Sequence, residues 1–537
     1  MRTTAWIIVL AAFAYPFRSV DTAPKPGFVI HFDFISNARE ARDLVRIAAH
    51  AGARVINVVP PAHIWENRGA TEMLDQILEE ISHRNLSVVI TRIDAAFPPD
   101  AKGGRFNYLY GRILTEPGVG PSGKKTSKYF LTTVGRAGYA EWMEDETHYY
   151  AEHYGRMPNL LGIDLGPFSE PFAAERCGFL EYESETGRYE ITQYTPEARN
   201  WFHHWLSRRY HGLERVNAEY GTAFASMDEI PLPVSETDGR FARAALAYYD
   251  FAGSLNDWLM EAYQRCRHLW HEASGRADVP FILQLSGFFP EKLIQGHPSF
   301  AAFDIPEWIY GADALGVSLY TNSGFPDFGH ASILAAVNIW GLARDLHKEV
   351  FVLEGGTEAP NVILDPGELE FYGTVARKLN PRTYIYEFLK DKFDDPFQSN
   401  PGKLVDSAGR IRKPAYRALQ KLFREISTDR TSPASAELYF LSDAAAARGD
   451  AQRGNLNAAL YDIASEVSIR YVPRKATMFL RPGVPIVTSH GDVSPKNEEL
   501  SQLFRHIPDI NAPARKSWHC AVVEAIRKIG AEGHAFF

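Results

Sequence analysis

Two glutamates each follow a short apolar run that has the pattern of a β-strand. Glu170 comes five residues after the run 160–165, and Glu354 directly follows the run 349–353. If both runs are strands of one parallel barrel, their carboxyl groups meet at its mouth, where catalytic groups of such barrels lie. Glycosidic cleavage needs a paired acid and base of this kind, since one carboxyl protonates the leaving oxygen while the other attacks the sugar or activates water. We therefore predict Glu170 and Glu354 as catalytic.

Eight apolar runs that alternate with helical patterns predict the scaffold that positions these glutamates. Alternating strands and helices with continuously apolar strands are typical of a parallel sheet covered on both faces. Eight such units favour a closed (β/α)8 TIM barrel, an α/β fold, over an open sheet. No Gly-x-Gly-x-x-Gly turn follows the first run, which argues against a dinucleotide-binding fold. The predicted strands are 28–34, 54–59, 87–93, 160–165, 281–285, 314–320, 349–353 and 383–388.

Two long insertions interrupt the predicted barrel. The segment 97–138 is rich in Gly, Pro, Lys and Tyr, so it is expected to be an irregular loop over one face. A second insertion follows the fourth strand and contains helical patterns at 196–210 and 241–271. Asn37, with Glu40 three residues later, predicts the capped start of the first helix.

The chain divides into a barrel and a smaller C-terminal part. We place the catalytic barrel at 24–426 and a polar linker at 427–435. Residues 436–537 are predicted to form an accessory α/β domain. Its expected elements are strands at 437–441 and 485–488, with a helix at 455–467 between them.

Further candidate substrate contacts stand where other predicted strands end. Asp33 ends the first strand and is expected to bind a sugar hydroxyl or to cap a loop. Arg92 ends the third strand, where it contacts the surroundings of the nucleophile or pairs with Asp94. Trp65, in the loop after the second strand, is either a stacking platform for a sugar ring or a packing residue.

The glutamates and their neighbourhoods resemble those of clan A retaining glycoside hydrolases. The Glu170-Pro171 pair closing strand four, with a lone Glu354 closing strand seven, carries this resemblance. The segment 201–231 is similar to the region after strand four in family 42 β-galactosidases, and 404–416 is typical of the clan. The resemblance implies that Glu170 is the acid/base and Glu354 the nucleophile, that the substrate is a β-linked oligo- or polysaccharide, and that no cofactor is needed. It also matches Tyr320 to a tyrosine that hydrogen-bonds the nucleophile.

Departures from the clan pattern affect two substrate contacts. Ser169 stands where the clan has an asparagine that contacts the sugar 2-hydroxyl, and Tyr386 and Glu387 stand where a tryptophan is usual. We therefore expect Ser169 and Glu387 to contact an unusual substrate. Two alternatives remain: a catalytically impaired barrel that binds polysaccharide, and an inverting enzyme like the β-amylases. The β-amylases share the Gly-Pro before Glu170 and the Asn…Gly-Thr segment.

The N-terminus has the pattern of an export signal. Arg2 precedes the apolar run 6–14, which is too short to span a bilayer. We predict a signal peptide at 1–23 and a periplasmic or extracellular location, with a short membrane anchor as the alternative. No other run reaches 18 apolar residues, so the mature chain is expected to lack a membrane span.

Charge and cysteine content limit the kinds of partner and metal site that are expected. The net charge is −9 and no basic run stands out, so no nucleic-acid partner is expected. Cys177, Cys266 and Cys520 lie far apart without Cys-x-x-Cys spacing, so no metal site is predicted. The pattern leaves the oligomeric state open, and a homo-oligomer remains one of the alternatives.

Overall fold

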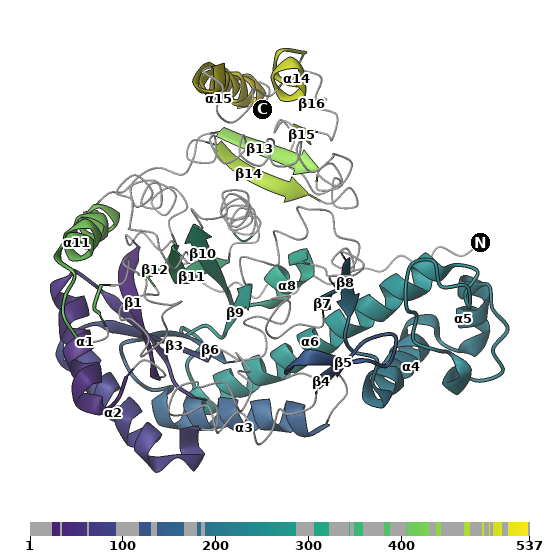
Figure 1. Ribbon diagram of the computed structural model, residues 1–537, viewed down its shortest axis with the longest axis horizontal. Coiled ribbons are helices and arrows are strands. Elements are labelled where there is room, and N and C mark those ends of the chain that lie inside the picture. The colour runs from purple at the N-terminus through teal and green to yellow at the C-terminus, as the bar shows by residue number, and fades with distance from the viewer. Residues whose placement is uncertain are drawn as a thin grey trace.

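The structure is a computed structural model in which a barrel carries a helical arm and a small C-terminal α/β unit (Figure 1). The arm extends from the barrel along the long helix α6 (Ala244–Ser274), and the C-terminal strands β13 (Ala436–Leu441) and β14 (Val467–Val472) lie beyond the barrel on another side (Figure 1). The structure describes residues 24–32, 35–61, 64–92, 117–129, 137–165, 180–183, 188–285, 305–321, 343, 348–357, 381–386, 404–406, 409–428, 436–441, 467–472, 486–487, 493–494, 498–506 and 514–534.

Eight parallel strands form the barrel, which confirms the predicted fold. Neighbouring strands follow the order β6-β3-β2-β1-β12-β11-β10-β9. The two end strands meet at a parallel bridge between Ile163 and Phe281, where the Ile163 amide donates to the Pro280 carbonyl at 3.1 Å. This contact closes the sheet. The strands are β1 (Lys25–His31), β2 (Val55–Val59), β3 (Ser87–Arg92), β6 (Leu160–Leu165), β9 (Ile282–Leu285), β10 (Ala314–Thr321), β11 (Glu349–Thr357) and β12 (Thr383–Tyr386).

All eight predicted runs coincide with strands, although their ends differ. β1 begins at Lys25, three residues before the predicted start, and β11 continues to Thr357, beyond the predicted end. The barrel interior is apolar toward its base, because inward residues from different strands pack as one buried cluster. Its members are Val29, Val55, Val59, Val89, Ile282, Ala314, Phe351, Leu353 and Ile385.

Helices cover the outer face of the barrel. They include α1 (Ala38–His50), α2 (Arg68–His83), α3 (Ala137–Tyr154), α6 (Ala244–Ser274), α8 (Ile305–Gly311) and α11 (Lys413–Thr428). The predicted cap of α1 is confirmed, because the Asn37 side chain accepts a hydrogen bond from the Glu40 amide at 3.0 Å. The Glu40 carboxylate in turn accepts from the Ser36 amide at 2.7 Å. This cap fixes where the chain leaves β1 and turns into α1.

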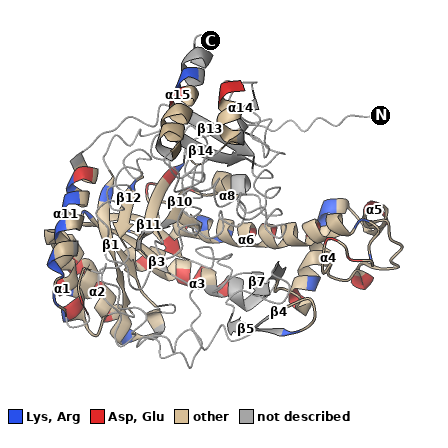
Figure 2. Cartoon of the chain, turned by 45° about the horizontal axis from the view of Figure 1, so that its top comes forward, with Lys and Arg blue, Asp and Glu red and all other residues tan. Residues whose placement is uncertain are grey.

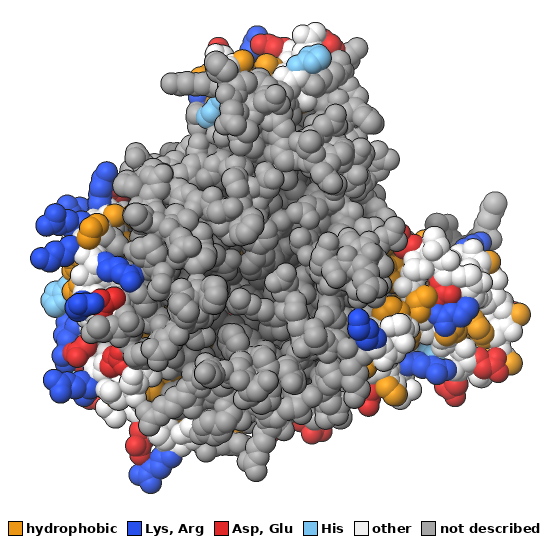
Figure 3. Space-filling view, in the orientation of Figure 1, with side chains coloured by type: hydrophobic (Ala, Val, Ile, Leu, Met, Phe, Trp, Pro, Cys, Tyr) orange, Lys and Arg blue, Asp and Glu red, His pale blue; other side chains and the backbone are white. Residues whose placement is uncertain are grey.

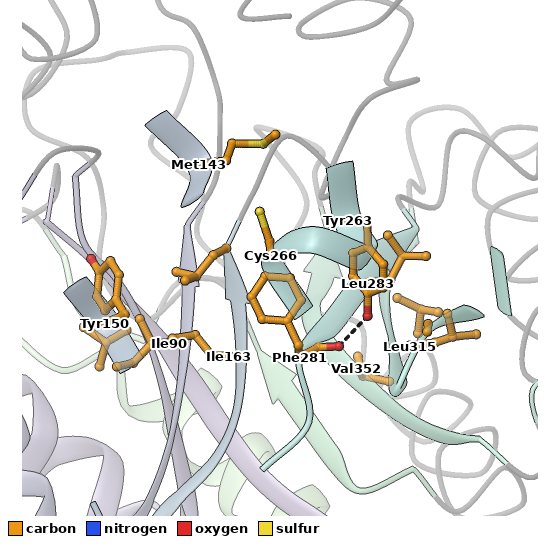
Figure 4. Close-up of a cluster of buried hydrophobic side chains, with 14 of the residues drawn as sticks. Ile90, Met143, Tyr150, Ile163, Tyr263, Cys266, Phe281, Leu283, Leu315 and Val352 are labelled. Carbon is orange, nitrogen blue, oxygen red and sulfur yellow. Dashed lines mark hydrogen bonds between the residues drawn. The ribbon is translucent and has the colours of Figure 1, made fainter. Parts of the chain in front are cut away.

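A second apolar layer joins the outward faces of the strands to α3 and α6 (Figure 4). This buried cluster includes Ile90, Ile163 and Leu315 from three strands, together with Tyr150 of α3 and Cys266 of α6. The Tyr263 hydroxyl of α6 donates to the Phe281 carbonyl at 2.6 Å. A buried phenol needs such a partner, so this bond fixes the position of α6 relative to the start of β9.

The first insertion contains a β-hairpin, so the irregular loop predicted for 97–138 is wrong at 117–129. β4 (Pro117–Val119) pairs antiparallel with β5 (Lys125–Tyr129). The Val119 amide donates to the Thr192 carbonyl and the Tyr194 amide donates to the Val119 carbonyl, both at 2.9 Å. The hairpin is thus tied to the second insertion, a partner that is distant in the sequence and leaves no local pattern to predict it.

The second insertion is mainly helical. The predicted helices are confirmed as α4 (Pro196–Tyr210) and as α6, which begins three residues later than expected. The sequence pattern missed the antiparallel hairpin of β7 (Leu180–Glu183) and β8 (Arg188–Ile191) and the short helix α5 (Leu213–Tyr220).

A buried carboxylate links the three helices of this insertion. The Asp250 carboxylate of α6 accepts the Tyr210 hydroxyl of α4 at 2.5 Å and the Tyr220 hydroxyl of α5 at 2.9 Å. Burial raises the pKa of Asp250, although both hydroxyls and the nearby Arg209 guanidinium oppose that shift. One buried carboxylate therefore joins all three helices.

The base of the barrel carries a charged network that anchors α6. Asp313, just before β10, accepts hydrogen bonds from His271 Nε2 at 2.6 Å and from the Phe281 amide at 3.1 Å, and also pairs with Arg267. Burial lowers the pKa of His271, but the bond to Asp313 and its charge outweigh burial and raise the pKa above the ordinary value. Burial raises the pKa of Asp313, but His271 and Arg267 reverse this and hold it below the ordinary value.

We expect this network to stabilise the fold less as the pH rises. The folded state binds the His271 proton more tightly than the unfolded chain, so its contribution is full below about pH 6.5 and is lost as the pH rises through the raised pKa. The Asp313 contribution, from a lowered pKa, is lost only in acid. Melting temperatures of wild type and His271→Gln, measured from pH 6 to pH 9, should therefore converge with rising pH. Parallel curves would contradict this linkage.

The C-terminal unit contains a four-stranded sheet in the order β14-β13-β15-β16. The predicted strands match β13 (Ala436–Leu441) and β15 (Ile486–Val487), while β14 (Val467–Val472) and β16 (Val493–Ser494) were missed. The helix expected at 455–467 lies outside the described residues except for Val467, which begins β14. Helices α14 (Glu498–Arg505) and α15 (Ala514–His534) complete the unit, and Trp518 Nε1 donates to the Leu503 carbonyl at 2.8 Å.

The predicted linker begins too early. Ser427 and Thr428 belong to α11, so the helix extends two residues past the expected end of the barrel, and 429–435 lie outside the described residues. Among the helices that the structure describes, none has the length and apolar content needed to cross a bilayer.

Candidate active site

Glu354 occupies an irregular position in β11. Val352 of β11 pairs with Val317 of β10, but the next residue of β10, Ser318, pairs with Glu354. Leu353 is therefore an extra residue, and a β-bulge lies directly before Glu354. Bulges interrupt the strict alternation of a strand and redirect the side chains that follow, and they are frequent next to active sites.

Two buried side chains bind the backbone of this bulge. Asn57 Nδ2, from β2, donates to the Leu353 carbonyl at 3.2 Å, and Thr383 Oγ1, from β12, donates to the Val352 carbonyl at 3.2 Å. Both residues have no exposed surface. The two carbonyls that immediately precede Glu354 are thus each held from another strand.

Asn57 and Thr383 belong to a set of polar residues on the barrel strands that sequence reasoning missed. All have zero exposure although the strands around them are apolar, and within β3 and β6 two of them, Thr91 and Asp164, are register partners. The available signal was a polar residue within or at the start of an apolar run, as in Val55-Ile-Asn-Val-Val59. The set comprises Asn57, Thr91, Asp164, Gln284 and Thr383.

Tyr320 and Arg92 lie at the carboxyl ends of their strands, as predicted. Tyr320 pairs with Gly356, two residues beyond Glu354 on β11. Arg92 is the last residue of β3 and pairs with Leu165, the last residue of β6 and five residues before Glu170. The backbones of Tyr320 and Arg92 therefore neighbour the two strands that lead to the predicted catalytic pair.

Trp65 packs on the outer helix layer. It lies in the 3-10 turn η2 (Ile64–Glu66), and its ring centroid is 5.3 Å from that of Tyr149 of α3, with the planes tilted by 41°. Tyr149 in turn stacks on His153 at 4.1 Å. Trp65 therefore packs against α3, and its role as a stacking platform for a sugar stays a prediction.

Glu170, Ser169, Asp33 and Glu387 lie outside the described residues. Their roles therefore stay predictions, supported by the strands that precede them. In the closed barrel, β6 and β11 are separated by β9 and β10 on the shorter path around the sheet. Because all eight strands are parallel, their carboxyl ends face one side of the barrel, as a shared site requires.

Charged side chains of the described surface are mixed in sign. Lys and Arg gather on the adjacent helices α1 and α11 (Figure 2) and appear along one edge of the space-filling view (Figure 3). Several have acidic partners: Arg46 contacts Asp43 at 2.7 Å, and Lys421 contacts Glu425 at 3.8 Å. Within the part of the chain that the structure describes, no group of His, Cys, Asp or Glu is arranged to hold a metal ion.

Comparison with known families gives a match in the helical insertion. The model of glycoside hydrolase family 42, described as β-galactosidase, matches residues 179–279. The similarity is to the family 42 β-galactosidases. This segment spans the β7–β8 hairpin and helices α4, α5 and α6, and it includes the region on which the sequence resemblance was based. No curated protein sequence matches the chain.

Solved structures of β-galactosidases share the fold. The enzyme of the haloarchaeon Halorubrum lacusprofundi is 17% identical with a TM-score of 0.60, and the alignment covers 83% of this chain and 66% of that one. The cold-adapted β-galactosidase of Rahnella sp. R3 is 13% identical with a TM-score of 0.61, covering 84% of this chain and 65% of that one. The chain thus spans just under two thirds of the length of these enzymes.

A β-amylase is also similar in fold. The catalytic domain of the Paenibacillus polymyxa enzyme is 14% identical with a TM-score of 0.55, and the alignment covers 76% of this chain and 100% of that one. The resemblance to clan A glycoside hydrolases is thereby confirmed at the level of fold, with family 42 as the better match and the β-amylases as the weaker one.

Proposed function

We propose that this protein is a glycoside hydrolase that cleaves a β-linked saccharide with retention of configuration. The observation that carries the proposal is the β-bulge directly before Glu354, three residues from the carboxyl end of β11, on a barrel similar to those of the family 42 β-galactosidases. Glu170 is the acid/base in this proposal and Glu354 the nucleophile. The residues that contact the sugar in this proposal are Asp33, Trp65, Arg92, Ser169, Tyr320 and Glu387.

The proposed reaction has two steps. The Glu354 carboxylate attacks the anomeric carbon while the Glu170 carboxyl protonates the departing glycosidic oxygen, which leaves a covalent glycosyl ester on Glu354. Glu170, now ionised, removes a proton from water as its oxygen attacks the anomeric carbon and releases Glu354. Two inversions give net retention. A separation of ~5–5.5 Å between the two carboxyl groups suits this route, against ~6.5–9.5 Å for an inverting enzyme.

A hydrolysis screen on aryl β-glycosides and oligosaccharides tests the proposal, with the anomer of the first product followed by NMR. We expect turnover with a β-configured product. An initially inverted product would instead support the β-amylase-like reading, which the complete coverage of the Paenibacillus polymyxa domain and the Gly166-Pro167 pair favour. A sugar-induced rise in melting temperature without any product would support a barrel that only binds polysaccharide.

We also propose that the protein is exported, on the basis of Arg2 and the apolar run 6–14. N-terminal sequencing of protein recovered outside the cytoplasm tests this proposal. A new N-terminus near residue 24 supports cleavage of a signal peptide, and an intact N-terminus in the membrane fraction supports the anchor alternative.

A further inference from the structure

We infer that Asn57 is a positioning residue for Glu354, and that it acts through the Leu353 carbonyl at the β-bulge of β11. The inference rests on the proposed function in one respect, the role of Glu354 as nucleophile. The contact itself is independent of that role, because it joins two buried groups within the barrel.

The bulge creates the need for a partner. At a bulge the extra residue falls out of register with the neighbouring strand, so its backbone groups leave the regular ladder. Leu353 is that residue and is fully buried. A buried carbonyl without a donor is unfavourable, and the donor that the structure supplies is Asn57 Nδ2 at 3.2 Å.

Asn57 contacts the bulge from a strand that is not its neighbour in the sheet. Its strand, β2, is separated from β11 by β1 and β12 in the sheet order, so the hydrogen bond crosses the barrel interior. Along β2, Asn57 lies between Val55 and Val59 on the same face of the strand, and both valines pack in the interior cluster. Packing alone would favour a third apolar residue at this position.

Burying Asn57 also costs free energy. Asn57 Oδ1 is buried, and none of the residues that the structure describes offers it a hydrogen bond. Because the Leu353 carbonyl can only accept, it fixes the orientation of the amide and leaves the buried Oδ1 directed away from the bulge. A buried asparagine whose Oδ1 lacks a hydrogen bond is explained if its Nδ2 group has a role, and that role is to hold the bulge.

Thr383 supports the same segment from the neighbouring strand. Its hydroxyl donates to the Val352 carbonyl, one residue earlier. Two successive carbonyls are thus fixed before Glu354, and the backbone that carries the nucleophile has little freedom to slide back into the regular register. A displacement of about 1 Å at a reacting group costs on the order of 100-fold in rate, so this restraint bears on catalysis.

The first test is Asn57→Leu, which keeps the side-chain size but removes the donor. We expect kcat, and the rate of trapping by a 2-deoxy-2-fluoro glycoside, to fall about 10- to 100-fold, with KM nearly unchanged. Thr147→Val is the control, because Thr147 is also buried but lies in α3, outside the barrel strands, and it likewise loses a hydrogen bond to a backbone carbonyl, that of Met143 at 2.8 Å. A kcat for Asn57→Leu that equals that of the control would overturn the inference.

The second test is the pH profile of Asn57→Asp. A protonated carboxyl donates to the Leu353 carbonyl, whereas an ionised one repels it, so the variant should regain kcat relative to wild type as the pH falls. A merely structural loss would not produce this additional ionisation. A kcat ratio that stays constant with pH would count against a role for the donor.

Failure of the proposed function is recognised separately. If wild type hydrolyses no glycoside, Glu354 is not a nucleophile. The positioning of the bulge by Asn57 is then tested by comparing crystal structures of wild type and Asn57→Leu. A bulge that is lost or shifted in the variant supports the positioning of this segment by Asn57, and an unmoved backbone overturns it. If Asn57→Leu does not fold, Thr383→Val removes the second donor and is read in the same way.

Discussion

Glu354→Gln and Glu170→Gln are each expected to lower kcat by about 10²–10⁴-fold or more while the melting temperature stays near that of wild type. Glutamine keeps the shape of the side chain but neither attacks as a carboxylate nor transfers a proton. The measurement is kcat on the best aryl β-glycoside from the screen, with the melting temperature as a control for folding. Wild-type rates in both variants would exclude the proposed pair.

The two variants should respond differently to the leaving group. A nitrophenolate leaves without protonation, so an activated aryl glycoside should partly restore the first step in Glu170→Gln but not in Glu354→Gln. Alanine at either position leaves room for an external anion, so added azide should give a β-glycosyl azide with Glu170→Ala and an α-glycosyl azide with Glu354→Ala, because only the second lacks the covalent intermediate. Exchanged products would reverse the two assigned roles.

The strands of the barrel were predictable because each satisfies a local rule. A run such as Val55–Val59 is buried over its whole length, so every residue in it is apolar or small, apart from Asn57. The α1 cap was predictable for a similar reason, since Asn37 and Glu40 lie three residues apart and bond within one turn. The β4–β5 hairpin was not, because its partner strand segment at 192–194 is distant in sequence.

The candidate site was likewise predictable where a local rule applied and not where it depended on distant contacts. Position at the end of a predicted strand suggested Glu354, Tyr320 and Arg92. The structure places Arg92 last in β3 and Tyr320 next to last in β10, whereas β11 continues for three residues beyond Glu354. Asn57 was passed over, because its meaning depends on a carbonyl from a strand that lies almost three hundred residues later. The bulge itself is a mismatch between two strands, β10 and β11, and neither sequence alone contains it.

Gly27→Ala is expected to destabilise the barrel by about 2–3 kcal/mol, a large effect for one added methyl group. A β-carbon at this position would overlap the carbonyl oxygen of Val55 and lie 2.8 Å from its carbonyl carbon. These atoms belong to the backbone of β2, which pairs with β1 at this point, so they cannot yield as a flexible side chain does. The strands would have to separate where the ladder begins, and the measurement is the melting temperature.

Gly253→Ala is the matched control, and its effect should have the opposite sign. Gly253 lies inside α6, and an added β-carbon there would meet nothing within 4 Å. Alanine should therefore stabilise the helix by about 0.5–1 kcal/mol, since it loses less conformational entropy on folding than glycine. If both variants melted at the same temperature, strand packing at Gly27 would be looser than the distances to Val55 require.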